Sequence, residues 1–190
     1  MTQADVLNLF RRSHGLLEGH FKLSSGLHSA GYLQCALVLQ QPKDAEALGR
    51  ALGEKLRSLQ ANVVLSPALG GLIIGHEVGR ALGVRAIFAE RQEKTLVLRR
   101  GFELSSADRV VVIEDVVTTG LSTRETMEVA RAHGATVVGA GAIIDRSGGK
   151  SNLDVPFHAL VQLNVETYQP DACPMCAAGQ PVVKPGSRGN

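Results

Sequence analysis

Short hydrophobic runs alternate with amphipathic stretches along most of the chain. Residues 63–65, 110–113 and 136–144 form continuous, mainly aliphatic runs, typical of strands that are buried on both faces of a parallel sheet. Between and before them, apolar residues recur at helical spacing and predict helices over residues 42–59 and 72–82. This alternation predicts an α/β fold, in which a mostly parallel sheet has helices on both faces.

Weaker patterns come before this core. Thr2 can cap a first helix that ends near Gly15. Residues 19–34 then favour two short strands joined by a turn at Ser24-Ser25-Gly26.

The remaining segments continue the alternation. Residues 85–90 and 157–165 predict two more strands, the second at an edge of the sheet, and residues 121–133 predict a helix. Residues 91–106 instead mix basic and acidic side chains, which fits a mobile flap and a plain solvated hairpin equally well. The tail from Pro170 contains further prolines and predicts an irregular arm.

The most informative stretch is residues 109–123, where a buried strand leads into a loop and a helix. Glu114 and Asp115 fall at the carboxyl end of the strand, the end at which open α/β sheets bind ligands. Residues 118–122 then supply hydroxyl groups and a glycine, and the helix begins at Leu121. Backbone N–H groups that converge at a helix N-terminus bind anions, so this loop is a candidate phosphate site.

An ordinary turn, in which Ser122 or Thr123 merely caps the helix, is the alternative. A cap explains neither the paired acids nor the threonines of the loop. Gly70-Gly71 follows an earlier strand in the same way, and again predicts bare N–H groups at the start of a helix.

Composition narrows the choice of partners. The chain has 190 residues and a formal net charge of +2, with acids and bases interspersed, so it offers no basic surface for nucleic acid. Apolar runs are too short to span a membrane, and we expect a soluble, cytoplasmic protein whose partners are small molecules. Gly149-Lys150-Ser151 resembles the end of a Walker A loop, but Ile144 stands in place of its leading glycine, which predicts an ordinary loop.

The three cysteines are too few for a disulfide framework. Cys173 and Cys176 form a lone Cys-x-x-Cys pair, and no second pair or histidine follows in the tail. Because a structural zinc site needs four ligands, a turn packed by small thiols is the favoured interpretation. None of the histidines shows a ligand spacing along the chain.

Residues 109–123 resemble the phosphoribosyl pyrophosphate (PRPP) signature of the type I phosphoribosyltransferases: a buried strand, two acids and a Thr-x-Gly-x-Ser/Thr loop. The pattern Phe-x-Leu-x-Ser-Gly-x-x-Ser over residues 21–29, Asp145-Arg146 and the tail from Cys173 are similar to the orotate phosphoribosyltransferases in particular. The resemblance covers nearly the whole chain. It implies the type I phosphoribosyltransferase fold in a single domain, with a hood over about residues 1–40, a core over about 41–168 and an arm over about 169–190.

The resemblance also implies a reaction, the transfer of phosphoribosyl from PRPP to orotate in pyrimidine (UMP) biosynthesis, with Mg²⁺ carried by PRPP and not by a protein metal site. The implied catalytic residues are Asp115, Glu114, Lys94 and Arg91. The implied PRPP ligands are Glu114, Asp115, Val116, Val117, Thr118, Thr119, Gly120, Leu121, Ser122, Arg91, Gly70 and Gly71. The implied orotate ligands are Thr118, Arg146, Phe21 and Lys22.

The sequence departs from many relatives at the pyrophosphate side. Gly70 and Ser24 stand where those relatives have lysines, so the missing charge is expected from the flap, with Arg91 and Lys94 as first candidates. Arg99 and Arg100 are further candidates, and the flap lacks the usual histidine of the family. In the family such a loop reaches into the neighbouring subunit, which implies a homodimer with shared active sites.

Three alternatives remain open. The same fold can serve a phosphoribosyltransferase for another base, although the hood and Arg146 argue against it. It can also serve a regulator that senses PRPP, but no nucleic-acid-binding motif is visible. Arg146 itself can be a surface residue paired with a neighbouring acid.

Overall fold

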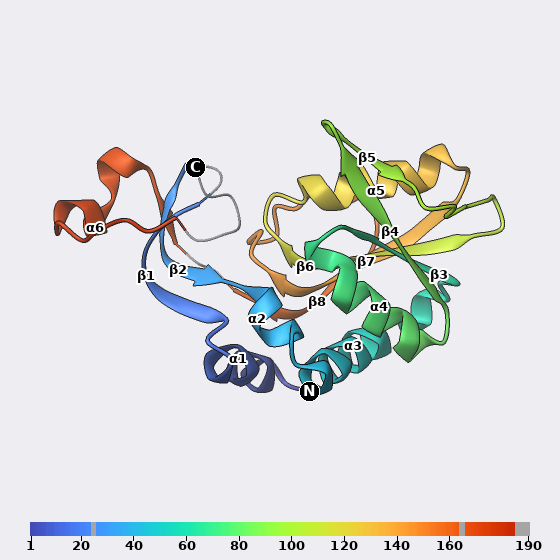
Figure 1. Cartoon of the computed structure of the whole chain (residues 1–190), viewed down its shortest axis with the longest axis horizontal. Coiled ribbons are helices and arrows are strands. Elements are labelled where there is room, and N and C mark those ends of the chain that lie inside the picture. The colour runs from blue at the N-terminus through green and yellow to red at the C-terminus, as the bar shows by residue number, and fades with distance from the viewer. Residues whose placement is uncertain (24–25, 164–165, 185–190) are drawn as a thin grey trace.

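The structure is a computed structural model that describes residues 1–23, 26–163 and 166–184, and these residues form two sheets (Figure 1). The larger sheet contains β3 (Val63–Pro67), β4 (Arg85–Gln92), β5 (Thr95–Leu98), β6 (Arg109–Val117), β7 (Thr136–Asp145) and β8 (Phe157–Gln162). Its spatial order is β5-β4-β3-β6-β7-β8, and every neighbouring pair is parallel except β4 and β5. The predicted α/β fold with a mostly parallel sheet is confirmed.

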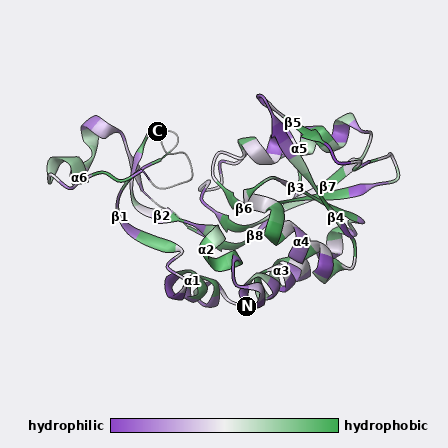
Figure 2. Cartoon of the chain, viewed as in Figure 1, coloured by the Kyte–Doolittle hydropathy of each residue, from purple (hydrophilic) through white to green (hydrophobic). Residues whose placement is uncertain are grey.

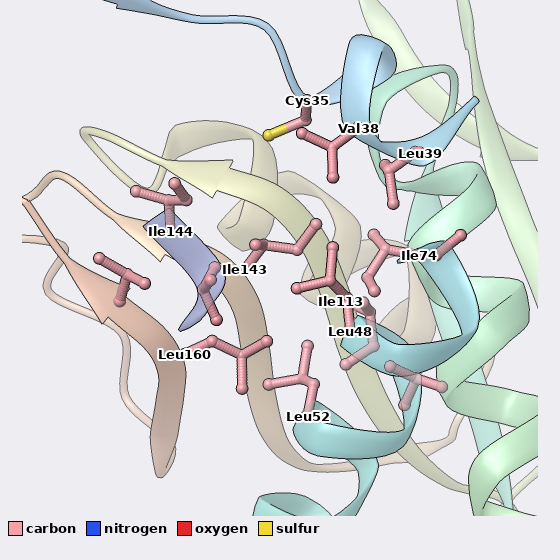
Figure 3. Packing of buried hydrophobic residues seen from close by; sticks show 14 of the residues in the cluster. Cys35, Val38, Leu39, Leu48, Leu52, Ile74, Ile113, Ile143, Ile144 and Leu160 are labelled. Atoms are coloured by element: carbon pink, nitrogen blue, oxygen red, sulfur yellow. The ribbon is translucent and has the colours of Figure 1, made fainter. Parts of the chain in front are cut away.

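Helices cover both faces of the larger sheet. On one face α3 (Pro42–Leu56), which the 3₁₀ turn η1 (Arg57–Leu59) extends, and α4 (Gly70–Leu82) pack on side chains such as Val111 and Ile113 (Figure 3). On the other face α5 (Leu121–Ala132) packs on Val110 and Val112, because side chains alternate between the two faces along a strand. This two-sided burial explains why the strands are hydrophobic throughout.

The N-terminal helices join this core. Thr2 caps α1 (Gln3–Arg12) through a capping box with Asp5, as its position predicted, and the helix ends before Gly15. Hydrophilic and hydrophobic residues both occur along α1 and α3, as in amphipathic helices (Figure 2). A further helix, α2 (Cys35–Leu39), was not predicted because five residues are too few to show a helical period.

Among the element boundaries that differ from the predicted ones, two bear on the site. β6 extends to Val117, so Glu114 and Asp115 lie inside the strand and not after it. Pairing with β7 carries the strand past the hydrophobic run. β4 likewise continues to Gln92, and the proposed flap is a hairpin whose second strand is β5.

The smaller sheet has the order β1-β2-β9 and lies at the far end of the molecule from β5 (Figure 1). It consists of β1 (Leu16–Lys22), β2 (His28–Leu33) and the two-residue β9 (Thr167–Tyr168), all antiparallel. We call these three strands the hood sheet. The predicted turn at Ser24-Ser25 and the end of the last predicted strand at Val165 lie outside the described residues.

The C-terminal arm is more regular than its prolines suggested. It contains the 3₁₀ turn η2 (Pro170–Ala172) and the short helix α6 (Pro174–Ala177), and then returns to the hood sheet. There Val183 N donates to His20 O and Val183 O accepts from Lys22 N, each at 2.8 Å. The limits of hood, core and arm given above stay a prediction. Among the described residues, no helix combines the length and apolar character needed to cross a membrane.

Candidate active site

The loop between β6 and α5 leaves the first turn of the helix open. Gly120 is the N-cap residue of α5, with a φ of 75° that favours glycine, and it has no side chain to cap the helix. Ser122 Oγ instead donates to Glu114 Oε2 at 3.0 Å. The interpretation of Ser122 or Thr123 as a simple cap is therefore wrong, and the residues of the first turn line a cavity.

This cavity has a volume of about 220 Å³. Nine of the twelve predicted PRPP ligands line it, namely Arg91, Glu114, Val116, Val117, Thr118, Thr119, Gly120, Leu121 and Ser122, together with Thr123 and Glu125. The other three predicted ligands, Asp115, Gly70 and Gly71, do not line it. A partial positive charge at the N-terminus of α5 and a loop with one glycine and several hydroxyl groups suit an anion of the size of a phosphate group.

A second loop packs against the loop between β6 and α5. It contains Gly149-Lys150-Ser151, has no regular secondary structure, and brings Ser151 O against Gly120. A Cβ atom on Gly120 would lie 2.6 Å from that oxygen, so the contact requires glycine. Arg124 donates to Ser151 O and, at 3.0 Å, to Thr119 O, which ties the two loops together.

The two acids differ in their surroundings. Glu114 is only 7% exposed, and burial, followed by the charge of Asp115, raises the pKa of its carboxyl group well above the usual value. Asp115 is half-buried and its Oδ1 accepts from Val116 N at 2.8 Å. We infer that Glu114 keeps its proton to a higher pH than an exposed glutamate would.

Glu114→Gln is expected to stabilise the ligand-free protein at pH 7 but not near pH 4. The raised pKa means that the folded chain holds a proton which the unfolded chain has released, so stability falls as the pH rises above the unfolded value of about 4.3. Below that pH both states are protonated and the penalty disappears. Urea midpoints at the two pH values measure the difference, with the exposed Glu54→Gln as control. An equal gain at both pH values would contradict the assigned burial effect.

Cys35 is a site residue that sequence reasoning missed. It begins α2, is 1% exposed, and lies at the edge of the core that Figure 3 shows. Burial raises the pKa of its thiol well above the usual value, and the nearby carboxylates of Asp115 and Glu114 raise it further. No sequence pattern links α2 to β6, so only the folded structure reveals this contact.

Gly70 lies close to Asp115, and Gly71 lies against the backbone of β6. A Cβ atom on Gly70 would lie 2.9 Å from Asp115 Oδ1, and one on Gly71 would lie 2.7 Å from Ile113 O. The start of α4 therefore packs directly on the carboxyl end of β6. Side chains larger than glycine would push this helix away from Asp115.

The basic residues of the hairpin lie in different surroundings. Arg91 lines the loop cavity of its own chain, forms an ion pair with Glu125, and donates to Lys94 O at 2.7 Å. The Lys94 side chain does not line that cavity; it borders a separate groove between β5 and α5. Arg100 is paired with Glu90 at 2.7 Å. Arg91 is thus the predicted flap cation that the structure brings to the loop.

Arg146 follows β7 at the same edge of the sheet. Its backbone N donates to Val117 O at 2.8 Å, and its buried Nε has no hydrogen-bond partner within the described part of the chain. Burial lowers the pKa of the guanidinium, an effect that Tyr32 partly opposes. None of the ion pairs of the described residues includes Arg146, which argues against the surface-pair alternative.

The two predicted hood ligands differ in exposure. Phe21 is buried and packs against Tyr32, with 5.9 Å between ring centroids, whereas the Lys22 side chain is exposed. Neither residue lines the loop cavity. No motif singled out Tyr32. Its ring packs against Phe21, and its hydroxyl group is close enough to Arg146 to raise the pKa of the guanidinium.

Metal-ligating side chains gather in two places. Glu114 and Asp115 offer the oxygen donors that Mg²⁺ prefers, but two acids do not form a closed protein cage, which fits an ion held mainly by substrate oxygens. Among the described residues, one group of three or more potential ligand residues lies close enough together to hold an ion, and it consists of His20, His28, Cys173 and Cys176. The expectation that the Cys-x-x-Cys pair lacks histidine partners was wrong, because the fold brings them from β1 and β2.

Comparisons with known proteins agree with this geometry. The model of the phosphoribosyl transferase domain family matches residues 37–169. The orotate phosphoribosyltransferase of Carboxydothermus hydrogenoformans is 54% identical over 186 residues, which cover 97% of either chain. That of Heliobacterium modesticaldum is 50% identical and covers 99% of this chain and 100% of the relative.

Solved structures support the fold. Orotate phosphoribosyltransferase from Mycobacterium tuberculosis, in complex with Fe(III) dicitrate, matches with a TM-score of 0.73 and 24% identity over 85% of this chain and 96% of that one. The same enzyme in complex with PRPP matches with a TM-score of 0.66 and 22% identity, again over 85% and 96%. From these matches, most strongly the full-length relatives near half identity, we conclude that the chain belongs to the orotate phosphoribosyltransferase family of phosphoribosyl transferase domain proteins.

Proposed function

We propose that this protein is an orotate phosphoribosyltransferase, a pentosyltransferase that joins the phosphoribosyl group of PRPP to orotate and releases pyrophosphate. The observation that carries the proposal is the acid pair of buried Glu114 and half-buried Asp115, which lies beside the N-terminus of α5, where the N-cap residue Gly120 has no capping side chain. The relatives named above carry the same activity in their names. The product, orotidine monophosphate, serves pyrimidine biosynthesis.

The acids suit the sugar side of such a reaction. The bond between C1 of the ribose and pyrophosphate breaks while a bond to a ring nitrogen of orotate forms, so positive charge develops on the ribose. Carboxylates fixed near the ribose hydroxyl groups stabilise this charge in a site that excludes bulk water. Asp115, held by Val116 N and next to Gly70, is the better placed of the two to meet substrate because it is less buried than Glu114.

The loop suits the phosphate of the ribose. The first turn of α5, Thr118, Thr119 and Arg91 all line one cavity, and their N–H, hydroxyl and guanidinium groups are the donors that a phosphate group needs. Glycine N–H groups at the start of α4 supply a second set of donors for the pyrophosphate. Magnesium, when bound with PRPP, would neutralise part of the pyrophosphate charge, with Glu114 and Asp115 as the protein oxygens within its reach.

Arg146 suits the base. Orotate is an anion, and the guanidinium is a permanent cation with donors in a planar fork. A buried Nε without a partner is costly unless a ligand completes its hydrogen bonds. We therefore assign Arg146 to orotate, with Phe21 and Tyr32 as neighbouring hood residues.

A spectrophotometric assay tests the proposal. Orotate absorbance should fall when PRPP and Mg²⁺ are added to the pure protein, and pyrophosphate should appear in equal amount. Uracil and adenine in place of orotate are the controls for base choice. Turnover of one of these bases with none of orotate would support a different phosphoribosyltransferase, and PRPP binding without any turnover would support a sensor.

A two-fold homodimer with shared sites stays a prediction. Lys94, at the exposed turn of the β4–β5 hairpin, does not line the loop cavity of its own chain and forms none of the ion pairs of the described residues, so it is a hairpin cation that can reach a partner. Lys94→Ala and Asp115→Asn subunits should each be nearly inactive alone. After subunit exchange, half of the dimers would be mixed with one intact site each, which restores about a quarter of wild-type activity. An inactive mixture with mixed dimers confirmed by native mass spectrometry would show that each hairpin serves its own subunit.

The cytoplasmic location also stays a prediction.

A further inference from the structure

A cluster of four potential metal ligands lies in the hood sheet and arm, outside the proposed active site. It consists of His20 on β1, His28 on β2, and Cys173 and Cys176 at the start and within α6. Their ligand atoms all lie within 4.8 Å of one another. The first three side chains are 3–6% exposed, so the cluster is a built, mostly buried feature and not a surface coincidence.

Three of the distances between ligand atoms are close to those around a tetrahedral zinc ion. With Zn–N bonds of about 2.1 Å and Zn–S bonds of about 2.3 Å, ligand atoms of a tetrahedral site lie about 3.4–3.8 Å apart. Cys173 Sγ and Cys176 Sγ lie 3.6 and 3.7 Å from His20 Nε2, and Cys176 Sγ lies 3.3 Å from His28 Nδ1. The two histidine nitrogens are closer, at 2.8 Å, and need to separate slightly around an ion.

Hydrogen bonding also prepares His20 as a ligand. Its Nδ1 lies 2.9 Å from the carbonyl oxygen of Gln180, which can only accept, so Nδ1 carries the proton and the lone pair is on Nε2. Such an outer hydrogen bond is the usual arrangement around a metal-binding histidine. The single lone pair of Nε2 faces His28 and both thiols, and it cannot accept a hydrogen bond from all three at once. One cation shared by the four groups satisfies them together.

We propose that His20, His28, Cys173 and Cys176 bind a structural zinc ion that fastens the C-terminal arm to the hood sheet. Two thiolates and two imidazoles with no open position favour zinc over magnesium, and a closed four-ligand set is structural in type. The site is independent of the proposed transferase activity. Its mechanical effect falls on β1, whose His20 O and Lys22 N already bond Val183 of the arm.

Metal content gives the first test. Protein produced in zinc-containing medium without a histidine tag, then dialysed, should contain one zinc ion per chain by mass spectrometry of the metal. Cys173→Ser and His28→Asn should lose it. Cys35→Ala and His14→Asn are matched controls that should retain it, because Cys35 is buried near the acids and His14 is exposed on the loop after α1. The asparagine also suits the φ of 55° at position 14.

Cobalt titration keeps the test valid if the ligand variants fail to fold. Wild-type protein that has been stripped with a chelator under reducing conditions should bind Co²⁺ with the visible absorption of a tetrahedral ion and a sulfur-to-metal charge-transfer band. Hydrogen exchange at the amides of Lys22 and Val183 should quicken in the metal-free protein, while exchange in β6 should not. Purified protein without zinc that also gives no thiolate band with Co²⁺ would overturn the proposal. So would a Cys173–Cys176 disulfide in protein alkylated at the moment of cell lysis.

Discussion

Asp115→Asn is expected to lower kcat about 10²- to 10³-fold, the usual cost of removing one preorganised charge that acts on the transition state. The fold should survive, because the asparagine oxygen can still accept the hydrogen bond from Val116 N. The space beside Gly70 is also unchanged, since the two side chains have nearly the same shape. Steady-state kinetics with PRPP and orotate, together with circular dichroism, measure both expectations.

Asp154→Asn is the matched control for this variant. Its side chain is 63% exposed and pairs with Arg131 on the protein surface, so the same chemical change there should leave kcat within about twofold of wild type. Wild-type turnover in Asp115→Asn would remove Asp115 from the transition state. A similar loss in both variants would point to a general effect of the substitution on folding.

Arg146→Ala is expected to weaken orotate binding by about 2–5 kcal/mol, the range for removing one partner of a buried charge pair. PRPP binding should change much less, because the cavity at the phosphate loop does not include Arg146. Calorimetric titration of each ligand separately measures the two affinities. Arg146→Lys should fall between wild type and alanine, since lysine keeps the charge but loses the planar fork.

Arg57→Ala provides the control for Arg146→Ala. Arg57 is exposed and lies after α3, before the amino end of β3. Among the ion pairs of the described residues it pairs only with Glu54. Its removal should leave both affinities unchanged. If Arg146→Ala instead lowers the affinities for orotate and PRPP equally, Arg146 supports the loop through its bond to Val117 and does not bind the base.

Local patterns predicted the parts of the fold that depend on local sequence. The buried strands, the long helices and the loop before α5 were found because each has a hydrophobic period or a glycine and hydroxyl pattern of its own. Boundaries failed where pairing with a neighbour decides them, as at Glu114 and Asp115, which β7 draws into β6.

Contacts between distant segments could not be predicted in the same way. Cys35 beside the acids, Arg91 against Glu125, and Tyr32 near Arg146 each join residues whose sequence separation carries no signal. The histidine and cysteine cluster is the clearest case, because His20 and Cys173 meet only after the arm has returned to β1. A search for ligand spacing along the chain finds only residues that are close in sequence, whereas these ligands are close only in the folded structure.

The pairing of β2 with β9 also affects the order in which the protein can fold during its synthesis on the ribosome. β2 is made early, but its partner β9 is made near the end, since Ser29 pairs with Thr167. At roughly 5–20 residues per second, the first hairpin waits on the order of ten seconds for its third strand, and a lone hairpin is barely stable. The stretch from β6 to α5 emerges in the meantime. A chain released too soon therefore carries the candidate phosphate site, residues 118–122, without a finished hood sheet.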